Sequence, residues 1–501
     1  MNKDFSYIMQ EQHDLSVISG IGALLGWDHM TYMPKAGSPD RAEQSAFLSK
    51  LSHERVVSDK LYNAIQGLAN ESTFATLEEY QQHIVKRLAK DVEKARKVPS
   101  VFVEKTAKVT TMAYESWEQA KTTNTYSLFA PHLKKILDLQ QEYISFFNIP
   151  GPKYNTLLDD YEEGMTVDIL KKEFLVLRKE LTSLVDIIIS SKRYDQQKKL
   201  CLSMTQKQQQ NLCMDLIKTI GLPQQRTRLD VSMHPFTTSL GDDDVRITTN
   251  YSKPNPLFSL FSTIHEAGHA LYELNLPKKQ YKDTVISDSP SLGIHESQSR
   301  FWENMIARGL PFWMFFYPNF EKYLQQPSMF TVESWYTYVN QVSPSLIRVE
   351  ADELTYCLHV ILRFELEQQL INQEITVNEL PEQWNQMMQE YLGVTPDSDA
   401  TGVLQDMHWS GGSFGYFPTY AIGSIYAAQL YQQLLRDNKD TDIQIRQGNF
   451  SSIVNWLTIK VHEKGRVHTA DELMKTICGE GLNSQVFLNY LKDKYLSLYE
   501  V

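Results

Sequence analysis

Two histidines and a glutamate stand at a spacing that suits metal-dependent hydrolysis. In the run His265-Glu266-Ala267-Gly268-His269 the two imidazoles are four residues apart, so on a helix they share one face and can bind one Zn²⁺. Glu266 follows the first imidazole and is placed to take a proton from a water molecule that attacks a carbonyl. Ala267 and Gly268 are small, and we expect them to leave room for a substrate beside the helix. The run predicts a zinc site with Glu266 as its general base.

A third protein ligand is required, because catalytic zinc sites usually carry three. The downstream sequence predicts a helix from about residue 291 to residue 308, which ends at Gly309. Glu296 on this helix is the predicted third ligand, and Glu303 is a weaker candidate. His295 points about 100° away from Glu296 on a helix and cannot share its direction. Zn²⁺ is the expected metal, with Co²⁺ or Mn²⁺ as alternatives, since the general affinity order does not decide the native ion.

The metal-binding run lies within a well-bounded predicted helix. Asn255 is a suitable N-cap, Pro256 stands at the first helical position, and Pro277 follows the last turn. Elsewhere apolar residues recur every three or four positions, as in residues 170–189, so the chain is predicted to be mainly α. Residues 228–251 differ, because they are rich in Thr and Val and alternate apolar with polar side chains. We predict a small β-sheet or hairpin there, whose edge strand can pair with an extended peptide.

The composition favours a globular protein that binds neither nucleic acid nor membranes. The net charge is −12 and the sequence pI is about 5.6, whereas phosphate backbones and anionic bilayers attract a basic face. No stretch approaches the roughly 18 apolar residues of a membrane-spanning helix, and the first residues lack the features of a secretory signal. The cysteines, Cys201, Cys213, Cys357 and Cys478, are scattered and fit reduced thiols. We therefore predict a cytoplasmic protein.

Six segments of the chain resemble motifs of the carboxypeptidase Taq family of metallocarboxypeptidases, and they occur in the family's order. The segments are His234-Pro235-Phe236, Asp244-Val245-Arg246-Ile247-Thr248, residues 265–269, His295-Glu296-Ser297, residues 347–353 with the sequence IRVEADE, and residues 402–409 with the sequence GVLQDMHW. Further likeness, from Trp27-Asp28 to Gly479-Glu480, extends over nearly the whole chain. Many peptidases share the metal-binding run alone, but the six segments together are specific to this family.

The resemblance implies a mainly α fold, with a large, saddle-like helical body and a deep active-site groove. It also implies a homodimer that removes C-terminal residues from peptides with broad specificity, using His265, His269 and Glu296 as metal ligands. We expect one helical domain over residues 1–501, in which two lobes flank the groove and the helices of residues 1–110 form a lid.

A carboxypeptidase needs a cation for the free carboxylate of its substrate, and the planar guanidinium of arginine binds a carboxylate through two parallel hydrogen bonds. Arg348, in the IRVEADE segment, is the first choice and Arg246 is the second. The alternative for each arginine is a structural salt bridge. The resemblance makes His234 a residue of the substrate groove, and a structural hydrogen bond to the backbone is the alternative there.

The developing oxyanion of the reaction needs hydrogen-bond donors besides the metal. His408 and Tyr420 are the candidate catalytic donors, and Tyr416 is a candidate for substrate contact. Simple packing is the alternative for each tyrosine, because the chain has 26 of them. Either Asp352 or Asp406 is expected to orient a ligating imidazole by accepting its second N–H.

Two other functions compete with that of a carboxypeptidase. An oligopeptide endopeptidase or dipeptidase of the same helical architecture would share His265, Glu266, His269 and Glu296. It would still cleave a peptide whose C-terminus is blocked by amidation. A non-catalytic helical scaffold would bind no stoichiometric metal. The family segments favour the carboxypeptidase.

Overall fold

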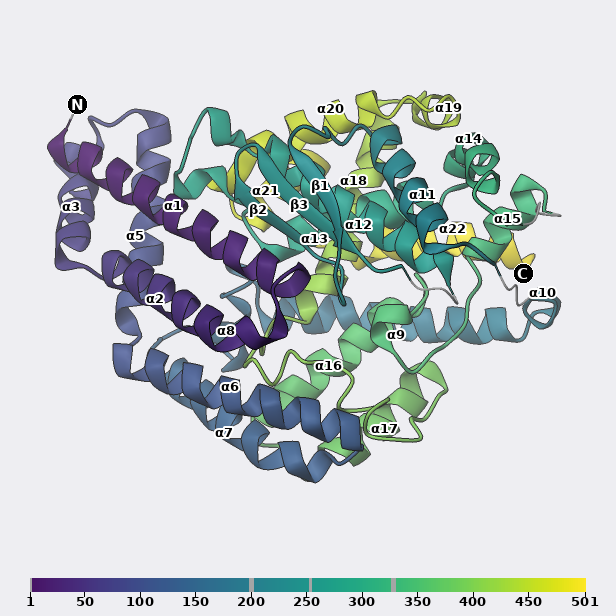
Figure 1. The fold of residues 1–501 in the computed structure, drawn as a ribbon, viewed down its shortest axis with the longest axis horizontal. Helices are drawn as coiled ribbons and strands as arrows, with labels where there is room; N and C mark the ends of the chain where they lie inside the picture. Colours follow the sequence, from purple (N-terminus) through teal and green to yellow (C-terminus); the bar gives the residue numbers. More distant parts are fainter. Residues whose placement is uncertain (1, 198–201, 252–254, 326–329) are drawn as a thin grey trace.

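The computed structural model describes residues 2–197, 202–251, 255–325 and 330–501. The protein is built mostly from helices, with one small sheet near the middle of the chain (Figure 1). The prediction of a mainly α fold is thereby confirmed. Within the described ranges, no helix has the length and apolar character that crossing a bilayer requires.

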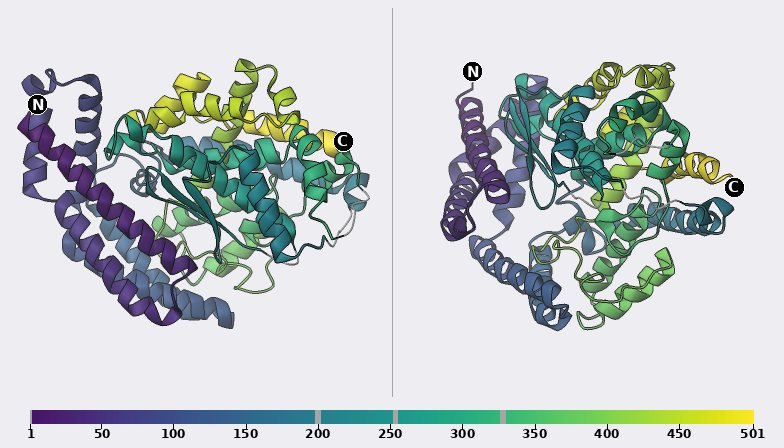
Figure 2. Two further views of the ribbon diagram at one scale, coloured as in Figure 1. Left: turned by 45° about the horizontal axis from the view of Figure 1, so that its top comes forward. Right: turned by 45° about the vertical axis from the view of Figure 1, so that its right-hand side comes forward.

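The first five α-helices form a layer on one side of the molecule (Figures 1 and 2). Their bounds, with one 3₁₀ turn, are α1 (Lys3–Thr31), η1 (Lys35–Gly37), α2 (Ser38–Val56), α3 (Asp59–Ala69), α4 (Glu71–Phe74) and α5 (Glu79–Lys97). Apolar residues at helical spacing, such as Phe5 and Ile8 of α1 and Leu61 and Ile65 of α3, meet in a small core. Ile286, from a segment near the middle of the chain, is buried in the same core, so the core also joins this layer to the rest of the molecule.

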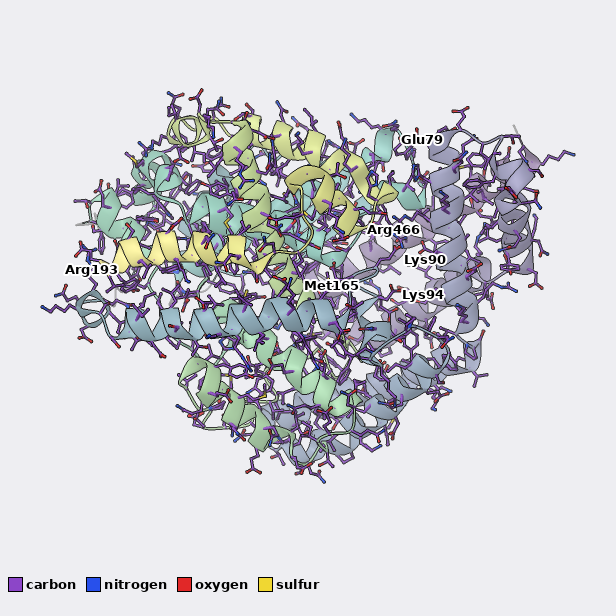
Figure 3. The ribbon with its side chains drawn as sticks, turned by 180° about the vertical axis from the view of Figure 1, so that it is seen from behind. Glu79, Lys90, Lys94, Met165, Arg193 and Arg466 are labelled. Carbon is purple, nitrogen blue, oxygen red and sulfur yellow. The ribbon has the colours of Figure 1, made fainter. Side chains whose placement is uncertain are left out.

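Ion pairs connect α5 to the rest of the molecule. Lys94 Nζ lies 2.7 Å from Asp160 Oδ1, and Arg466 Nη1 lies 2.6 Å from Asp91 Oδ2. Figure 3 shows Lys90 and Lys94 along α5, with Arg466 on the neighbouring part of the body. These pairs are partly exposed, so each one contributes little by itself, but together they form a network.

A helical hairpin and four further helices follow. Their bounds are α6 (Ser100–Thr123), α7 (Tyr126–Ser145), α8 (Tyr154–Leu158), α9 (Val167–Ile189), α10 (Lys192–Asp195) and α11 (Gln206–Thr219). Helices α6 and α7 pack against each other at the bottom of Figure 1. Asn124 ends α6 with a φ of 50°, a left-handed conformation that asparagine tolerates, and so reverses the chain.

The predicted small sheet is present beside the helix that carries the metal-binding run. Its strands are β1 (Thr227–Val231), β2 (Thr237–Gly241) and β3 (Asp244–Thr249), in the order β1-β3-β2. β1 is parallel to β3, and β2 is antiparallel to it. Val245 and Ile247 of the central strand are fully buried in the main core, so the sheet is fixed on that core.

The remaining elements form most of the body around one large apolar core. They are α12 (Pro256–Asn275), η2 (Pro277–Lys279), η3 (Val285–Ser287), α13 (Leu292–Arg300), η4 (Phe301–Ala307), α14 (Leu310–Glu321), α15 (Val332–Val339), η5 (Arg348–Glu350), α16 (Tyr356–Ile371), α17 (Leu380–Leu392), α18 (Pro418–Asp437), α19 (Thr441–Arg446), α20 (Ser451–Lys460), η6 (His462–Val467), α21 (Ala470–Cys478) and α22 (Ser484–Tyr499). Cys213 and Cys357 are buried free thiols, Cys478 is partly buried and free, and Cys201 lies outside the described residues.

The two helices that carry the predicted metal ligands begin at capping residues. Asn255 caps α12 by accepting a hydrogen bond from the Leu257 amide at 3.2 Å, and α12 ends before Pro277, as predicted. Ser291 caps α13 through the Ile294 amide at 3.1 Å. The predicted helix over 291–308 is confirmed with one difference, because its second half, η4, is π-helical. Such widened turns are frequent at functional sites.

Candidate metal centre

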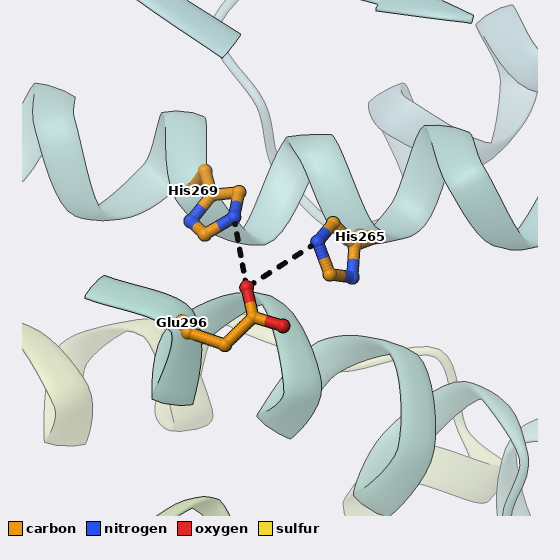
Figure 4. Close-up of side chains that lie close together, drawn as sticks. All are labelled: His265, His269 and Glu296. Carbon is orange, nitrogen blue, oxygen red and sulfur yellow. Dashed lines mark ion pairs between the residues drawn. The ribbon is translucent and has the colours of Figure 1, made fainter. Parts of the chain in front are cut away.

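Three side chains from two packed helices converge inside the body. α12 presents His265 and His269 on one face, and α13 presents Glu296 opposite them (Figure 4). Glu296 Oε2 lies 3.6 Å from His265 Nε2 and 3.4 Å from His269 Nε2. The three ligand atoms all lie within 4.8 Å of one another. Among the described residues, Glu303 and His295 do not belong to this group.

Two glycines let the helices approach closely enough for this convergence. A Cβ on Gly268 would lie 2.7 Å from the Gln298 carbonyl oxygen of α13, and one on Gly423 of α18 would lie 2.5 Å from Glu296 Cγ. Gly268 therefore faces the backbone of the neighbouring helix, and Ala267 is fully buried in the core. The expectation that these two residues leave room for a substrate is wrong, because other parts of the chain fill that space.

The charge states of these side chains suit a divalent cation. Burial opposes ionisation of Glu296, but Arg300 and the two imidazoles hold its pKa well below its usual range. Arg300 Nε donates to Glu296 Oε1 at 2.8 Å, while Oε2 faces the imidazoles. Burial lowers the pKa of His269 to about 3, so this imidazole is neutral near pH 7, as a metal ligand must be. Imidazole nitrogens and a carboxylate are donors that Zn²⁺ accepts, so the residues present fit a metal ion.

The carboxylate that orients His265 is not one of those expected. His265 Nδ1 lies 2.9 Å from Glu303 Oε2 of η4. Asp352 instead accepts backbone N–H groups before α16, and Asp406 pairs with two arginines. The expectation for both aspartates is therefore wrong. Sequence spacing offered a signal for Glu303, because a residue seven positions after Glu296 lies on the same helical face.

His295 faces a different carboxylate from its neighbour Glu296, as the helical rotation requires. His295 Nε2 lies 3.0 Å from Glu273 Oε1 of α12. Its ring stacks on that of His269, with the ring centroids 4.3 Å apart. His295 thus supports one of the converging imidazoles from the side.

Glu266 is buried next to the converging side chains, with 6% of its surface exposed. Burial raises its pKa, while His265 and a hydrogen bond from Thr237 act in the opposite direction. Thr237 Oγ1 of β2 donates to Glu266 Oε2 at 2.6 Å, which fixes one oxygen of the carboxylate and joins the sheet to α12. Sequence reasoning missed Thr237, since a threonine in a strand is common. Its position directly after His234-Pro235-Phe236 was the only signal.

Arg348 lies in a buried cluster of two arginines and one aspartate. Arg348 Nη2 is 2.8 Å from Asp406 Oδ1, and Arg363 Nη2 is 2.5 Å from Asp406 Oδ2. Arg348 Nη1 also donates to Tyr356 OH at 3.2 Å. The salt bridge that was the alternative reading of Arg348 is thus present. Burial lowers the pKa of Arg363 only to about 10, so both guanidinium groups are charged near pH 7. With one carboxylate between them, they leave one surplus positive charge.

His408, Tyr416 and Tyr420 form an aromatic cluster beside Arg348. His408 Nε2 lies 3.3 Å from Tyr420 OH, and the Tyr416 and Tyr420 ring centroids are 5.3 Å apart. The Arg348 guanidinium carbon lies 4.8 Å from the centroid of the Tyr420 ring. Burial lowers the pKa of His408 to about 4, so its imidazole is neutral near pH 7. Within the described part of the chain, His408 Nδ1 has no hydrogen-bond partner. The structure therefore brings these four predicted residues together.

Arg246 and His234 belong to the sheet region. Arg246 Nη2 of β3 lies 2.8 Å from Asp244 Oδ2 on the same strand. Its guanidinium carbon lies 4.2 Å from the centroid of the Trp27 ring of α1. Arg246 thus forms the structural salt bridge that was its alternative reading and connects the N-terminal helices to the sheet. His234 is exposed in the turn between β1 and β2.

A helical body that brings two imidazoles and a carboxylate together, with a buried glutamate beside them, is typical of metallopeptidases. The family model described as Carboxypeptidase Taq (M32) metallopeptidase matches residues 7–495. Carboxypeptidase 1 of Bacillus subtilis is 38% identical over 480 residues, which cover 95% of each chain. Thermostable carboxypeptidase 1 of Pyrococcus furiosus is 38% identical over 500 residues, which cover 99% of each chain.

Solved structures agree with the sequence relatives. An M32 carboxypeptidase from Deinococcus radiodurans R1 superposes with a TM-score of 0.95, at 34% identity and over 100% of both chains. A carboxypeptidase structure from Pyrococcus furiosus superposes with a TM-score of 0.94, at 37% identity and over 99% of both chains. The chain belongs to the carboxypeptidase Taq (M32) family of metallopeptidases. It is a metal-dependent carboxypeptidase, so the resemblance, the fold class and the type of enzyme inferred from the sequence are confirmed.

Proposed function

We propose that His265, His269 and Glu296 hold a divalent cation in this carboxypeptidase, and that the native ion is Zn²⁺. The observation that carries the proposal is the convergence of His265 Nε2, His269 Nε2 and Glu296 Oε2 within 4.8 Å. When bound, the cation lowers the pKa of a water molecule and polarises the carbonyl of the scissile bond. Co²⁺ and Mn²⁺ are the alternative ions, because the same donors accept them.

Glu266 is the proposed general base. Its raised pKa makes it a stronger base than an exposed glutamate, and it can return the proton to the leaving amine. Because Thr237 holds Oε2, we assign the proton transfer to Oε1. Taking a proton from the water molecule and returning it to the leaving amine both require a carboxylate that is fixed in position and shielded from bulk water. Glu266 meets these conditions.

The cluster around Arg348 is the proposed site for the free C-terminal carboxylate of the peptide. Its surplus positive charge is buried, where it attracts a carboxylate more strongly than an exposed charge does. Arg246 and His234 are assigned to contacts with the remainder of the peptide, along the side of the groove formed by the sheet. This assignment rests on their family segments and on the place of the sheet beside α12.

His408 and Tyr420 are the proposed donors to the oxyanion that develops on the scissile carbonyl. A neutral imidazole carries one N–H, and when that proton resides on Nε2 it can donate from the side of the ring that faces Tyr420 OH. His408 Nδ1 is buried and lies 3.9 Å from Asp406 Oδ1, so Nε2 is the nitrogen that we assign to the substrate. Tyr416, whose ring packs against both side chains, is assigned to substrate contact.

Mass spectrometry of the products from one short peptide, with elemental analysis of the enzyme, tests this proposal. The enzyme should carry one equivalent of zinc and shorten the unblocked peptide one residue at a time from its C-terminus. It should leave the amidated peptide intact and should accept varied C-terminal residues. Internal cleavage of the amidated peptide would favour the endopeptidase alternative instead. Activity without any bound metal would overturn the metal assignment.

We further propose that the chain acts in the cytoplasm as a homodimer of single-domain subunits, with two lobes that flank the groove and the helices of residues 1–110 as a lid. The small core shared by α1, α3 and α5 supports a lid that folds as one unit, and the ion pairs of α5 connect that unit to the rest of the molecule. Val17, Ile21 and Leu24 form an exposed apolar stripe along α1, which supports an interface between subunits. Light scattering should give the mass of two 58.0 kDa chains. A monomer at working concentrations would contradict the dimer.

A further inference from the structure

Glu367 of α16 is a fully buried carboxyl group that takes no part in the chemistry proposed above. Trp409 Nε1 donates to its Oε1 at 2.7 Å, and the Gly415 amide donates to its Oε2 at 2.9 Å. The Tyr154 hydroxyl of α8 donates to Oε2 as well. Burial raises the pKa of Glu367 to about 7, and these three hydrogen bonds act against that rise. A buried carboxyl group is costly, so the contacts that it makes indicate what it does.

Two of the three donors are the ends of one loop. Residues 409–415 connect His408 to Tyr416, and both of these flanking residues are assigned to the substrate. Inside the loop, the His408 carbonyl accepts hydrogen bonds from the amides of Gly411 and Ser413 at 3.2 and 3.0 Å. The loop is therefore folded back onto the residue that precedes it, and Glu367 holds its two ends at a fixed separation.

A second side chain of α16 holds Asp406, two residues before His408. Arg363 stands one helical turn before Glu367, and its Nε donates to Asp406 Oδ2 at 2.7 Å. His408 is thus bracketed along the chain by Asp406 and Trp409, and both are bound to α16. The arrangement makes α16 a rigid support for this part of the site.

We propose that Glu367 is a positioning residue for peptide hydrolysis, which fixes the loop 409–415 and thereby places His408 and Tyr416 against the substrate. The inference rests on the proposed roles of those two residues. Glu367 itself touches neither the substrate nor the metal ligands in this account. The side chains that it places must be held to within a fraction of an ångström, because small displacements of a catalytic group lower the reaction rate strongly.

Glu367→Gln tests the inference, because an amide has only one acceptor oxygen and cannot satisfy both Trp409 and Gly415. We expect kcat to fall about 10- to 100-fold, with full metal content. KM for an unblocked peptide should change less than about threefold, because the Arg348 cluster stays intact. Glu365→Gln is the matched control, since this partly exposed neighbour on α16 pairs with Arg178 and should keep the wild-type kcat. An unchanged kcat in Glu367→Gln would overturn the inference.

A second pair of variants separates positioning from stability, and it also decides the case if Glu367→Gln does not fold. Trp409→Phe removes one of the two hydrogen bonds between Glu367 and the loop, whereas Tyr154→Phe removes a bond of the same carboxylate to α8. We expect Trp409→Phe to lower kcat about tenfold, and Tyr154→Phe to lower the melting temperature while kcat is kept. Equal losses of kcat in the two variants, or losses that follow the folded fraction, would show a structural role only.

His408→Ala distinguishes failure of the inference from failure of the proposed function. Loss of activity in His408→Ala together with an unchanged kcat in Glu367→Gln would overturn the positioning role alone. A wild-type kcat in His408→Ala would overturn the proposed role of His408 and, with it, the reason for holding the loop. Loss of kcat in both variants, with metal content preserved, is the result that the inference expects.

Discussion

Gly423 is the position where one added methyl group should disturb the metal centre most directly. A Cβ there would lie 2.5 Å from Glu296 Cγ, 2.6 Å from Glu296 Cβ and 3.1 Å from its backbone carbonyl carbon. Favourable carbon–carbon contacts are about 3.5 to 4.0 Å long. Gly423→Ala must therefore push Glu296 or the whole of α13 away by about 1 Å, which removes Oε2 from its place between the imidazoles.

The displacement should weaken metal binding and cost some stability. Overpacking a core costs about 1 to 3 kcal/mol, and disturbing the groups that orient metal ligands typically lowers affinity about 10- to 100-fold. We expect Gly423→Ala to bind zinc about 10- to 100-fold more weakly, measured by competition with a chromogenic chelator. Its kcat at saturating zinc should also fall, because a displaced Glu296 holds the ion in a different position.

Gly26→Ala is the matched control for this variant. Gly26 lies in α1, and a Cβ built on it meets no atom within 4 Å. The control should keep the wild-type zinc affinity and kcat. Undiminished zinc affinity and unchanged thermal unfolding in Gly423→Ala would refute the close packing of α13 on α18 and, with it, the position assigned to Glu296.

Three further predictions concern the base, the substrate carboxylate and a buried acid near α13. Glu266→Gln should retain its zinc by elemental analysis and lose about 10²- to 10⁴-fold in kcat on a short unblocked peptide; full activity would remove Glu266 from the role of base. Arg348→Gln should raise KM for unblocked peptides about tenfold or more, as loss of a hydrogen-bonded charge does; an unchanged KM in steady-state assays would contradict the carboxylate site. Glu162 accepts a hydrogen bond from the Gly293 amide, and burial raises its pKa from 4.5 to about 8. Because its folded pKa is raised, its contribution to stability is full below about pH 4.5 and is lost as pH rises through about 8. Glu162→Gln keeps the acceptor, so it should gain stability over the wild type between pH 5 and 8.5, by at most about 5 kcal/mol; a pH-independent difference in urea unfolding would contradict this.

The centre of the site could be predicted from sequence because its chemistry is local. The four-residue spacing of His265 and His269 fixes a shared helical face, and the caps at Asn255 and Ser291 define the helices that present the ligands. Glu296 followed from the same reasoning, since only one direction on the second helix can face the first. The small sheet was also predictable, because the period of its apolar residues differs from that of the helices.

Contacts between distant segments were beyond sequence reasoning. Thr237 holds Glu266 across 29 positions, and Arg348 reaches Asp406 across 58 positions. The local pattern does not show which carboxylate pairs with which side chain. For this reason either Asp352 or Asp406 was expected to orient a ligating imidazole, whereas Glu303 lies against His265. Gly268 was misjudged for the same reason, because the neighbour that requires a glycine there belongs to another helix.

Anomalous diffraction at the zinc edge, from crystals of enzyme that is active before crystallisation, tests the central claim most directly. One strong anomalous peak should lie within about 2.0 to 2.2 Å of His265 Nε2, His269 Nε2 and Glu296 Oε2. A peak bound elsewhere in the chain, with these three side chains turned away from one another, would contradict the account.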